Sequence, residues 1–447
     1  MSKHVLVIGF ARSGAAVASL LLTEGATVTV SDPKLDRTDE RVIALTKQGV
    51  TFTERQDDTL LTQVDLIVKN PGIPYQIAIL QAAQARKIPI VVEVAVAQAY
   101  IKGPWIALTG SNGKTTTTEM IAAVLRTQAT PEAQVVVAGN IGTPVSEVAP
   151  SLRATDTLLT ELSSFQLMGM PTAKPNIAII TNIFASHLDY HGTRENYVAA
   201  KMGITKNQTA DDFLVINYDR PEWRELAKQT AATVIPVARQ FDNKQGAYES
   251  QGNLYYQGEL IMAVDQLGVP GDHNIENALV AIAVGKLQGV PTSQIATALH
   301  LFSGVAHRLE HVGSFAGRQV YNDSKATDIE ATEMALSGFT GPVVLLGGGL
   351  DRGDDQMRLL PAMKDKVKAL VVFGQTADKL AAVGHALSIP VVQAADAPHG
   401  VGPAFELSEP GDTILLSPAA ASWDQFPSFE VRGDQFVDAV KAYAQQQ

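Results

Sequence analysis

The chain has 447 residues, of which 46% are apolar and none is cysteine, and its formal net charge at pH 7 is −11. This length exceeds what one hydrophobic core supports, so we expect several domains, and the lack of cysteine excludes disulfides, thiolate metal sites and cysteine nucleophiles. The acidic balance argues against nucleic acid as a partner, because no basic stripe is present to neutralise phosphates. Since Met1 leads into a strand pattern without a signal peptide, and no apolar run approaches the roughly 20 residues that span a bilayer, we expect a cytoplasmic protein without membrane insertion.

Apolar strand patterns and helical patterns alternate along nearly the whole chain, which is typical of parallel sheets covered by helices. They fall into three blocks. In the first, strands are expected at residues 5–8, 27–31, 65–69 and 90–92, with a helix at 13–24. In the second, they are expected at 135–137, 157–160, 177–181 and 213–217, before polar hairpins near 241–257 and helices at 274–287 and 293–302. In the third, a hairpin at 310–315 and 318–321 precedes strands at 343–346, 369–373, 391–393 and 413–416.

A glycine-rich turn connects an apolar strand that begins at Trp105 to a helix that begins at Lys114. We call residues 110–116 the phosphate loop; they are Gly110, Ser111, Asn112, Gly113, Lys114, Thr115 and Thr116. Backbone N–H groups and a helix N-terminus converge there, which favours polyphosphate binding. We expect Lys114 to reach the terminal phosphates and Thr115 to ligate Mg²⁺. The spacing is G-x-x-G-K-T, with Leu108 where the usual loop has its first glycine; the alternative is an ordinary strand–turn–helix.

A second glycine-rich turn, Gly9 to Gly14, follows the first strand, and Asp32 ends the next strand 23 residues after Gly9. This pattern nearly meets the dinucleotide fingerprint, but Ala11 replaces its middle glycine. The signal for a nicotinamide cofactor is therefore weak, while another diphosphate nucleotide is reasonable there. The turn at residues 70–73 offers a further ligand contact at the same sheet edge.

Glu161 lies at the end of an apolar strand, where a carboxylate beside a phosphate loop suits Mg²⁺. The alternative is a helix-capping box, since Ser163 and Ser164 also fit cap positions. Both interpretations can hold for neighbouring residues.

His187, Asp189 and His191 gather after another strand, which favours a functional site over isolated structural histidines. Asp189 and His191 fit surface or supporting positions equally well. Lys201 follows His187 by 14 residues, and from spacing alone it is a solvent-facing helix lysine.

Polar residues also mark three later positions. Asn274 and Asn277 lie at i and i+3 on one helix face, where two amides can read a base edge or bind phosphate; the alternative is a solvated first turn with Asp272 as N-cap. Arg308 offers a guanidinium that can clamp a transferred phosphate. The cluster at 322–328 is dense in polar groups at a strand-to-helix switch, although such a composition is often only a turn.

On these motifs the chain resembles the Mur ligase and folylpolyglutamate synthase superfamily, and over its whole length it resembles the Mur ligases. The shared segments are residues 110–116, Glu161, His187, 272–277 and 307–308. Residues 322–327 and 416–426 resemble the corresponding segments of the D-glutamate-adding members. Asp328 stands where Asn is common and Ala420 where Cys is frequent; neither change removes a group that the chemistry needs.

The resemblance implies three α/β domains. They are a Rossmann-like N-terminal domain that binds a UDP substrate (1–98), a central P-loop ATPase-like parallel-sheet domain that binds ATP (99–305), and a Rossmann-like C-terminal domain that binds an amino acid (306–447). It also implies the activity, which is the addition of D-glutamate to UDP-N-acetylmuramoyl-L-alanine through an acyl phosphate in peptidoglycan synthesis. The enzyme would depend on ATP and Mg²⁺ and would be a monomer.

The resemblance further assigns site residues. The UDP substrate would contact Gly9, Arg12, Ser13, Asp32, Asn70, Gly72 and Asn140. ATP would contact the phosphate loop with Asn274, Asn277, Arg308 and Asp323. D-glutamate would contact Lys325, Thr327, Arg352, Ser422 and Phe429. Mg²⁺ would be held by Thr115, Glu161, His187 and Lys201, the last converted by CO₂ to a carbamate.

The catalytic residues implied are Lys114, Glu161, His187, Lys201 and Asp323. His187 and Asp323 are both candidates for the base that takes the proton of the attacking amine, and the sequence does not choose between them. Two other classes stay open. One is a sister ligase of different amino-acid or folate specificity, and the other is a non-ligase nucleotide-binding protein, either an NTP-driven switch or a dehydrogenase.

Overall fold

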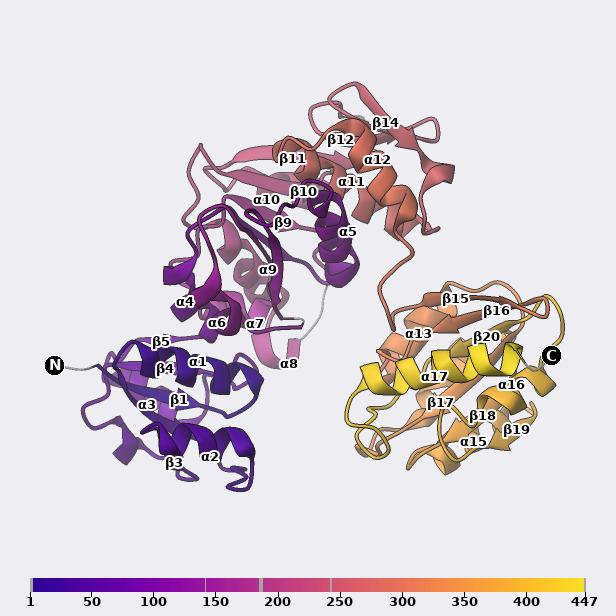
Figure 1. Cartoon of the computed structure of the whole chain (residues 1–447), viewed down its shortest axis with the longest axis horizontal. Coiled ribbons are helices and arrows are strands. Elements are labelled where there is room, and N and C mark those ends of the chain that lie inside the picture. The colour runs from indigo at the N-terminus through magenta and orange to yellow at the C-terminus, as the bar shows by residue number, and fades with distance from the viewer. Residues whose placement is uncertain (1–2, 141, 185–187, 242, 446–447) are drawn as a thin grey trace. The chain divides into compact units, whose positions relative to one another are not determined.

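The computed structural model describes residues 3–140, 142–184, 188–241 and 243–445, with the side chains of residues 188 and 189 left out. The chain forms two compact units that divide between Phe302 and Ser303 (Figure 1). The first unit carries two sheets and the second carries one, so the predicted α/β class with three sheets is confirmed. The boundaries that we propose, after residues 98 and 305, leave one sheet in each part.

The first sheet has five parallel strands in the order β3-β2-β1-β4-β5. Its strands are β1 (His4–Ile8), β2 (Thr27–Ser31), β3 (Thr51–Thr53), β4 (Leu66–Lys69) and β5 (Ile90–Val91), and its helices are α1 (Arg12–Thr23), α2 (Glu40–Lys47), α3 (Ala78–Ala85) and α4 (Glu93–Ala97). Successive β1 residues enter opposite cores, because side chains alternate across a strand and both faces are covered. The chain turns to β2 on one side of β1 and to β4 on the other, so β1 is the switch point where ligands bind to such sheets.

The second sheet has nine strands in the order β14-β13-β12-β11-β10-β9-β6-β8-β7. Its strands are β6 (Trp105–Thr109), β7 (Val135–Gly139), β8 (Thr157–Glu161), β9 (Ile177–Ile180), β10 (Phe213–Asn217), β11 (Thr233–Ala238), β12 (Ala247–Ser250), β13 (Asn253–Tyr256) and β14 (Glu259–Ala263). Strands β6 to β12 pair in parallel, and β12 to β14 form the predicted antiparallel hairpins.

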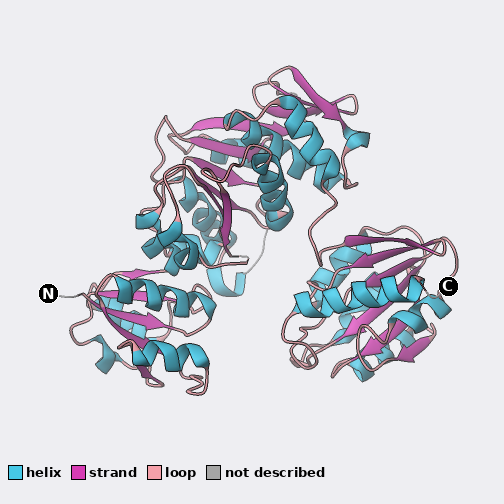
Figure 2. Cartoon of the chain, viewed as in Figure 1, coloured by secondary structure: helices cyan, strands magenta, loops and turns pink. Residues whose placement is uncertain are grey.

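The helices of this part are α5 (Lys114–Arg126), α6 (Val145–Val148), α7 (Ser164–Met168), α8 (Leu188–His191), α9 (Arg194–Met202), α10 (Pro221–Ala227), α11 (Asp272–Leu287) and α12 (Thr292–Leu301). Figure 2 shows the strands of the sheets flanked by helices. Strand β6 is buried along its whole length, which fixes the point from which the phosphate loop leaves the sheet.

The second unit has six strands in the order β15-β16-β20-β17-β18-β19. They are β15 (Glu310–Phe315), β16 (Arg318–Asn322), β17 (Val343–Gly348), β18 (Val367–Phe373), β19 (Val391–Gln393) and β20 (Thr413–Leu416), with helices α13 (Ile329–Ser337), α14 (Leu360–Met363), α15 (Ala377–Ala386), α16 (Val401–Leu407) and α17 (Phe429–Ala444). The predicted β15–β16 hairpin turns at Ala316 and Gly317, both at positive φ, as a tight hairpin turn requires. Within the described ranges, no helix combines the length and the apolar character needed to cross a membrane.

Candidate functional site

The phosphate loop has the backbone that its sequence predicts. Gly113 caps α5 with φ +76°, a left-handed conformation that glycine adopts without strain. A Cβ at Gly110 would lie 1.9 Å from the Thr181 hydroxyl oxygen, and one at Gly113 would lie 2.8 Å from Asn277 Oδ1. Both glycines are therefore needed for close packing, and Gly113 is needed for the turn as well.

Two lysines converge on this loop. Lys114 Nζ donates to the carbonyls of Gly110 and Ser111, each at 3.0 Å, and Lys201 Nζ donates to Gly110 O at 2.8 Å. Lys201 is only 2% exposed, so its interpretation from spacing as a solvent-facing lysine is wrong. The helix face of Lys201 packs against the loop, a tertiary contact that the local pattern does not reveal. Burial, followed by the charge of Lys114, lowers the pKa of Lys201 to about 7.

Glu161 connects the loop to the neighbouring strands. Its carboxylate accepts from the Thr115 hydroxyl at 3.2 Å and from the Asn140 amide at 3.0 Å. Ser163 also forms the capping box with Gln166, so both interpretations of this segment hold locally. Among the described residues no three His, Asp or Glu side chains form a metal-binding group. The oxygens that could ligate a cation at this place include the Thr115 hydroxyl and the Glu161 carboxylate, which lie 3.2 Å apart.

The predicted His187 lies outside the described residues. The sequence did not single out Asn182 and Tyr197, which support the loop. Asn182 Oδ1 accepts from the Asn112 N–H at 2.8 Å, and its amide donates to the Asn112 carbonyl at 3.0 Å. The Tyr197 hydroxyl lies 2.9 Å from the Ser111 hydroxyl. Asn182 follows the apolar strand β9, the same signal that identified Glu161.

The start of α11 lies against the phosphate loop. Asn277 Oδ1 accepts from the Thr117 hydroxyl at 2.9 Å, and the Asn277 amide donates to Asn274 Oδ1 at 3.3 Å. Asp272 is the first helical residue and pairs with Arg239 at 3.1 Å, whereas the N-cap is Gly271 at φ +103°. The interpretation of Asp272 as N-cap is therefore wrong, because the chain enters the helix through a conformation that favours glycine.

The predicted UDP-substrate residues of the first sheet lie at the carboxyl ends of neighbouring strands. A Cβ at Gly9 would lie 3.0 Å from the Asn70 side chain, so the loop after β1 touches the turn after β4. Asp32 Oδ2 accepts from the Phe10 N–H at 2.7 Å and so fixes the Gly9–Gly14 loop. Gly72 N–H donates to Asn70 Oδ1 at 3.2 Å.

Arg12 and Ser13 lie in the first turn of α1. Arg12 donates to the Gly142 carbonyl at 2.8 Å and pairs with Glu147 at 3.2 Å, which joins the first sheet to the loop that carries Asn140. The Arg12 and Glu147 side chains are both substantially exposed, so the pair orients the loop more than it stabilises the fold.

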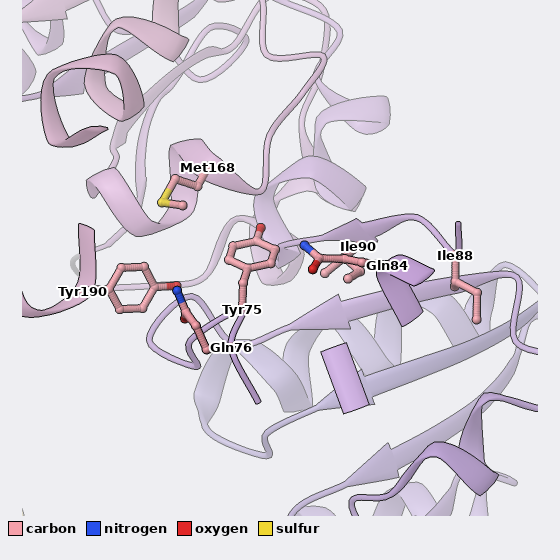
Figure 3. A pocket seen from close by; sticks show the side chains of 7 residues that line it. All are labelled: Tyr75, Gln76, Gln84, Ile88, Ile90, Met168 and Tyr190. Carbon is pink, nitrogen blue, oxygen red and sulfur yellow. The ribbon is translucent and has the colours of Figure 1, made fainter. Parts of the chain in front are cut away.

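An open hollow of about 500 Å³ lies between the first sheet and helices α7 and α8 (Figure 3). Its lining is uncharged and mixes amides, phenols and apolar side chains: Tyr75, Gln76, Gln84, Ile88, Ile90, Met168 and Tyr190. The Tyr190 hydroxyl at its wall is hydrogen-bonded to the carbonyls of Pro71 and Ile73, so the hollow adjoins the 70–73 turn.

In the second unit, Asp323 directly follows β16 and lies beside Ser417, which directly follows β20. Its carboxylate accepts from the Ser417 hydroxyl at 2.8 Å and from the Leu309 N–H at 3.1 Å. Burial raises the pKa of Asp323 to about 7, against the opposing effect of these hydrogen bonds. A carboxyl poised near neutral pH suits a general base.

Arg308 is held in a strained turn. His307 and Leu309 on either side have φ of +62° and +43°, which non-glycine residues rarely adopt. The Asn322 amide lies 3.0 Å from His307 Nδ1, and the Lys325 N–H donates to the His307 carbonyl at 3.0 Å. Such strain is retained where the surrounding contacts fix a functional side chain.

The predicted D-glutamate residues come from three segments of the second unit. Lys325 Nζ lies 5.5 Å from the Phe429 ring centroid, and Arg352 lies 5.0 Å from the ring centroid of Trp423, which follows the buried Ser422. Thr327 is half-buried in the turn before α13.

Arg432, which sequence reasoning did not single out, connects these segments. It is fully buried, and burial lowers its pKa to about 10. Its guanidinium donates to the carbonyls of Ser324 at 2.7 Å, Ala420 at 3.1 Å and Gly348 at 3.3 Å. An arginine in an otherwise amphipathic last helix gives no local signal of this role.

The sequence matches three family descriptions. They are "Mur ligase MurD-like, N-terminal domain" over residues 3–92, "Mur ligase middle domain" over 108–285 and "Mur ligase, glutamate ligase domain" over 307–420. The UDP-N-acetylmuramoylalanine--D-glutamate ligase of Lactiplantibacillus plantarum is 51% identical over 98% of this chain and 96% of that protein. The ligase of the same name from Limosilactobacillus reuteri is 49% identical over 98% of this chain and 96% of that protein.

Solved structures show the same fold at lower identity. UDP-N-acetylmuramate-alanine ligase MurC from Thermotoga maritima aligns with a TM-score of 0.57 at 20% identity, covering 99% of this chain and 100% of that one. MurF ligase from Thermotoga maritima, solved in complex with ADP, aligns with a TM-score of 0.56 at 16% identity. The alignment covers 100% of this chain and 96% of that one. These two likenesses concern the fold alone.

Proposed function

This chain belongs to the Mur ligase family, and from that premise we propose how its residues join D-glutamate to UDP-N-acetylmuramoyl-L-alanine. It is an ATP-dependent, amide-forming ligase of peptidoglycan synthesis. The observation that carries the specificity is near 50% identity, over almost the whole chain, to relatives named for that reaction.

The chemistry requires activation of the acceptor. A carboxylate and an ammonium group do not condense in water, so the alanyl carboxylate must first take the γ-phosphoryl group of ATP to form an acyl phosphate. The amine of D-glutamate then attacks the acyl carbon, the C–N bond forms, and phosphate leaves. Phosphoryl transfer depends on positioning and charge neutralisation, which we assign to the phosphate loop and Lys114.

We propose that Mg²⁺ is held by the Thr115 hydroxyl and the Glu161 carboxylate, with His187 as a further ligand. These two oxygens lie 3.2 Å apart at the loop, and hard oxygen donors suit this ion. When bound, the ion would neutralise charge on the phosphates. We assign a further anionic ligand to Lys201: its neutral amine adds to CO₂, forming an N–C bond and releasing one proton, to give a carbamate.

The attacking amine must lose a proton, and we propose that Asp323 is the base that accepts it. Its pKa of about 7 lets the carboxylate accept that proton at neutral pH. We propose Arg308 and Asp323, with Asn274 and Asn277, as ATP contacts. Lys325, Thr327, Arg352, Ser422 and Phe429 are the proposed D-glutamate contacts.

The first sheet provides most of the proposed site of the UDP substrate. We assign the Gly9–Gly14 loop, with Arg12 and Ser13, to the diphosphate and Asp32 to the uracil. Asn70 and Gly72, with Asn140 from the second sheet, are assigned to the sugar side. Placement at the carboxyl ends of β1, β2 and β4 supports this assignment, because nucleotides bind at such edges. We also propose that the enzyme is a cytoplasmic monomer without a nucleic-acid partner, in line with its net charge of −11.

Phosphate release against a panel of substrates tests the proposal. With ATP, Mg²⁺ and UDP-N-acetylmuramoyl-L-alanine, D-glutamate should stimulate release, whereas L-alanine, L-lysine and meso-diaminopimelate should not. Stimulation by one of these other amino acids but not by D-glutamate would show a sister ligase. Release without acceptor and amino acid would show an NTP-driven switch, and a requirement for nicotinamide would show a dehydrogenase.

A further inference from the structure

Lys69, the last residue of β4, is buried although its side chain carries an amine. It is 1% exposed, and burial lowers the pKa of Lys69 to about 8. Burying an ammonium is costly unless its donors are satisfied. The contacts of its amine must therefore offset the cost of burial, and the reaction described above does not use this residue.

The amine of Lys69 holds the turn that follows it. Nζ lies 2.9 Å from the carbonyl oxygen of Ile73, 3.0 Å from that of Pro71 and 3.3 Å from that of Asn70. Three carbonyls that converge on one donor group fix the path of a four-residue turn. Nζ also lies 4.6 Å from the ring centroid of Tyr75, so an aromatic face covers the charge.

The same turn is held from the second sheet. The hydroxyl of Tyr190, a residue of α8, lies 3.2 Å from Ile73 O, 3.3 Å from Pro71 O and 3.3 Å from Lys69 Nζ. Its ring packs edge-on against Phe165 of α7, with centroids 4.5 Å apart. Figure 3 shows Tyr190 and Tyr75 at the hollow beside this junction. Lys69 and Tyr190 thus join two domains through the backbone of one turn.

The position of this turn matters for the neighbouring loop. A Cβ at Gly9 would come within 3.0 Å of both Asn70 Cβ and Ile73 Cδ1. The Asn70 N–H donates to the Ile8 carbonyl at 2.8 Å, immediately before Gly9. The turn is therefore adjacent to the loop to which we assign the diphosphate, so the part of the substrate that follows the diphosphate can reach it.

We propose that Lys69, with Tyr190, is a positioning residue that holds the 70–73 turn in the geometry that accepts the sugar–peptide portion of the UDP substrate. The inference rests on the proposed function, since it assumes that this turn faces that substrate. It assigns no role to Lys69 in phosphoryl transfer or in binding of the nucleotide portion.

Calorimetric binding of two ligands tests the proposal. Lys69→Met keeps an unbranched side chain but removes the donors, and Tyr190→Phe removes one hydroxyl and keeps the ring. We expect Lys69→Met to bind UDP-N-acetylmuramoyl-L-alanine at least about 10-fold more weakly and Tyr190→Phe about 3-fold more weakly, while both bind UDP within 2-fold of the wild type. Lys47→Met, at an exposed lysine that ends α2, is the matched control and should bind both ligands as the wild type does.

Steady-state kinetics should likewise show an effect on the UDP substrate alone. The KM for the UDP substrate should rise, whereas the KM for ATP and for D-glutamate should stay within 2-fold. In Lys69→Met, adding Tyr190→Phe should cause little further loss, because both act on one turn. Equal weakening of UDP and the full substrate, or unchanged binding of both in the two variants, would overturn the proposal. Failure of the wild type to bind the full substrate would instead overturn the proposed function.

Discussion

The side-chain amine of Lys201 donates a hydrogen bond to the backbone carbonyl of Gly110 over 2.8 Å, although 91 positions separate the two residues. The amine of Lys114 donates to the same carbonyl at 3.0 Å. Two amines share one acceptor in a buried position, so the neutral form of one of them is favoured. Burial and the charge of Lys114 act on Lys201, whose pKa falls to about 7.

This arrangement predicts that Lys201 acts as a carbamate. Lys201→Ala should lose about 100-fold or more in kcat, because an anionic ligand near the phosphates is missing. Acetate should partly restore its activity, whereas Lys201→Arg should not respond, since a guanidinium retains the positive charge. The measurement is phosphate release with and without added acetate.

Wild-type activity should also fall in CO₂-depleted buffer and recover when bicarbonate is added. The Lys201→Ala enzyme is the control and should show no bicarbonate response. A fully active Lys201→Ala variant would contradict the carbamate.

Lys114→Ala should lower kcat by about 100- to 1000-fold, the usual cost of removing one group that stabilises charge in the transition state. The affinity for UDP-N-acetylmuramoyl-L-alanine should stay within about 3-fold of the wild type, because the Lys114 amine contacts Gly110 and Ser111, whereas all the proposed UDP-substrate residues except Asn140 lie at the first sheet. Calorimetry with each substrate separates the two effects. An equally severe loss of UDP-substrate affinity would argue against separate sites.

Gly113→Ala should raise the KM for ATP strongly, because the new Cβ would lie 2.8 Å from Asn277 Oδ1 in addition to the strain of φ +76°. Gly289→Ala is the matched control: its φ is also +76°, but open space surrounds its Cβ position. Both variants should lose about 1–2 kcal/mol of stability from the left-handed backbone. If Gly289→Ala raises the KM for ATP as much as Gly113→Ala does, contact with Asn277 is not the cause.

The raised pKa of Asp323 predicts that kcat/KM depends on pH. Burial raises its pKa from 3.8 to about 7, so the carboxylate that acts as base forms only as the pH rises through about 7. The value of kcat/KM should therefore fall on acidification through this range. Asp323→Asn should lose this dependence and about 100-fold or more of the rate.

Unfolding gives an independent check of the Asp323 pKa. Since the folded state binds this proton more tightly than the unfolded state, the wild type should lose stability as pH rises from about 4 to 7. Asp323→Asn should lose less over the same range. Equal pH dependence of unfolding for both proteins would argue against the raised pKa.

The amino-acid sequence alone predicted the α/β class, the hairpin turned at Ala316 and Gly317, and the phosphate loop. These features are local: apolar alternation sets strands, and glycine at a left-handed position sets a turn. Glu161 was found for the same reason, because it ends an apolar strand. Local patterns also singled out Asp32, His187, Asn274, Asn277 and Arg308 as candidates. The family resemblance assigned their ligands and added Asn140, Arg352, Ser422 and Phe429.

The meeting of separate segments is visible in the folded protein alone. The tertiary structure placed Lys201 against the phosphate loop, made Arg432 the link between Ser324, Gly348 and Ala420, and set the Lys69 amine under the 70–73 turn. It also showed that the N-cap of α11 is Gly271 and that Asp272 is the first helical residue. A lysine or arginine in a helical or strand pattern looks the same whether it faces water or a row of carbonyls. Burial and hydrogen-bond partners depend on which distant segments pack together, and local sequence does not encode that packing in any short-range pattern.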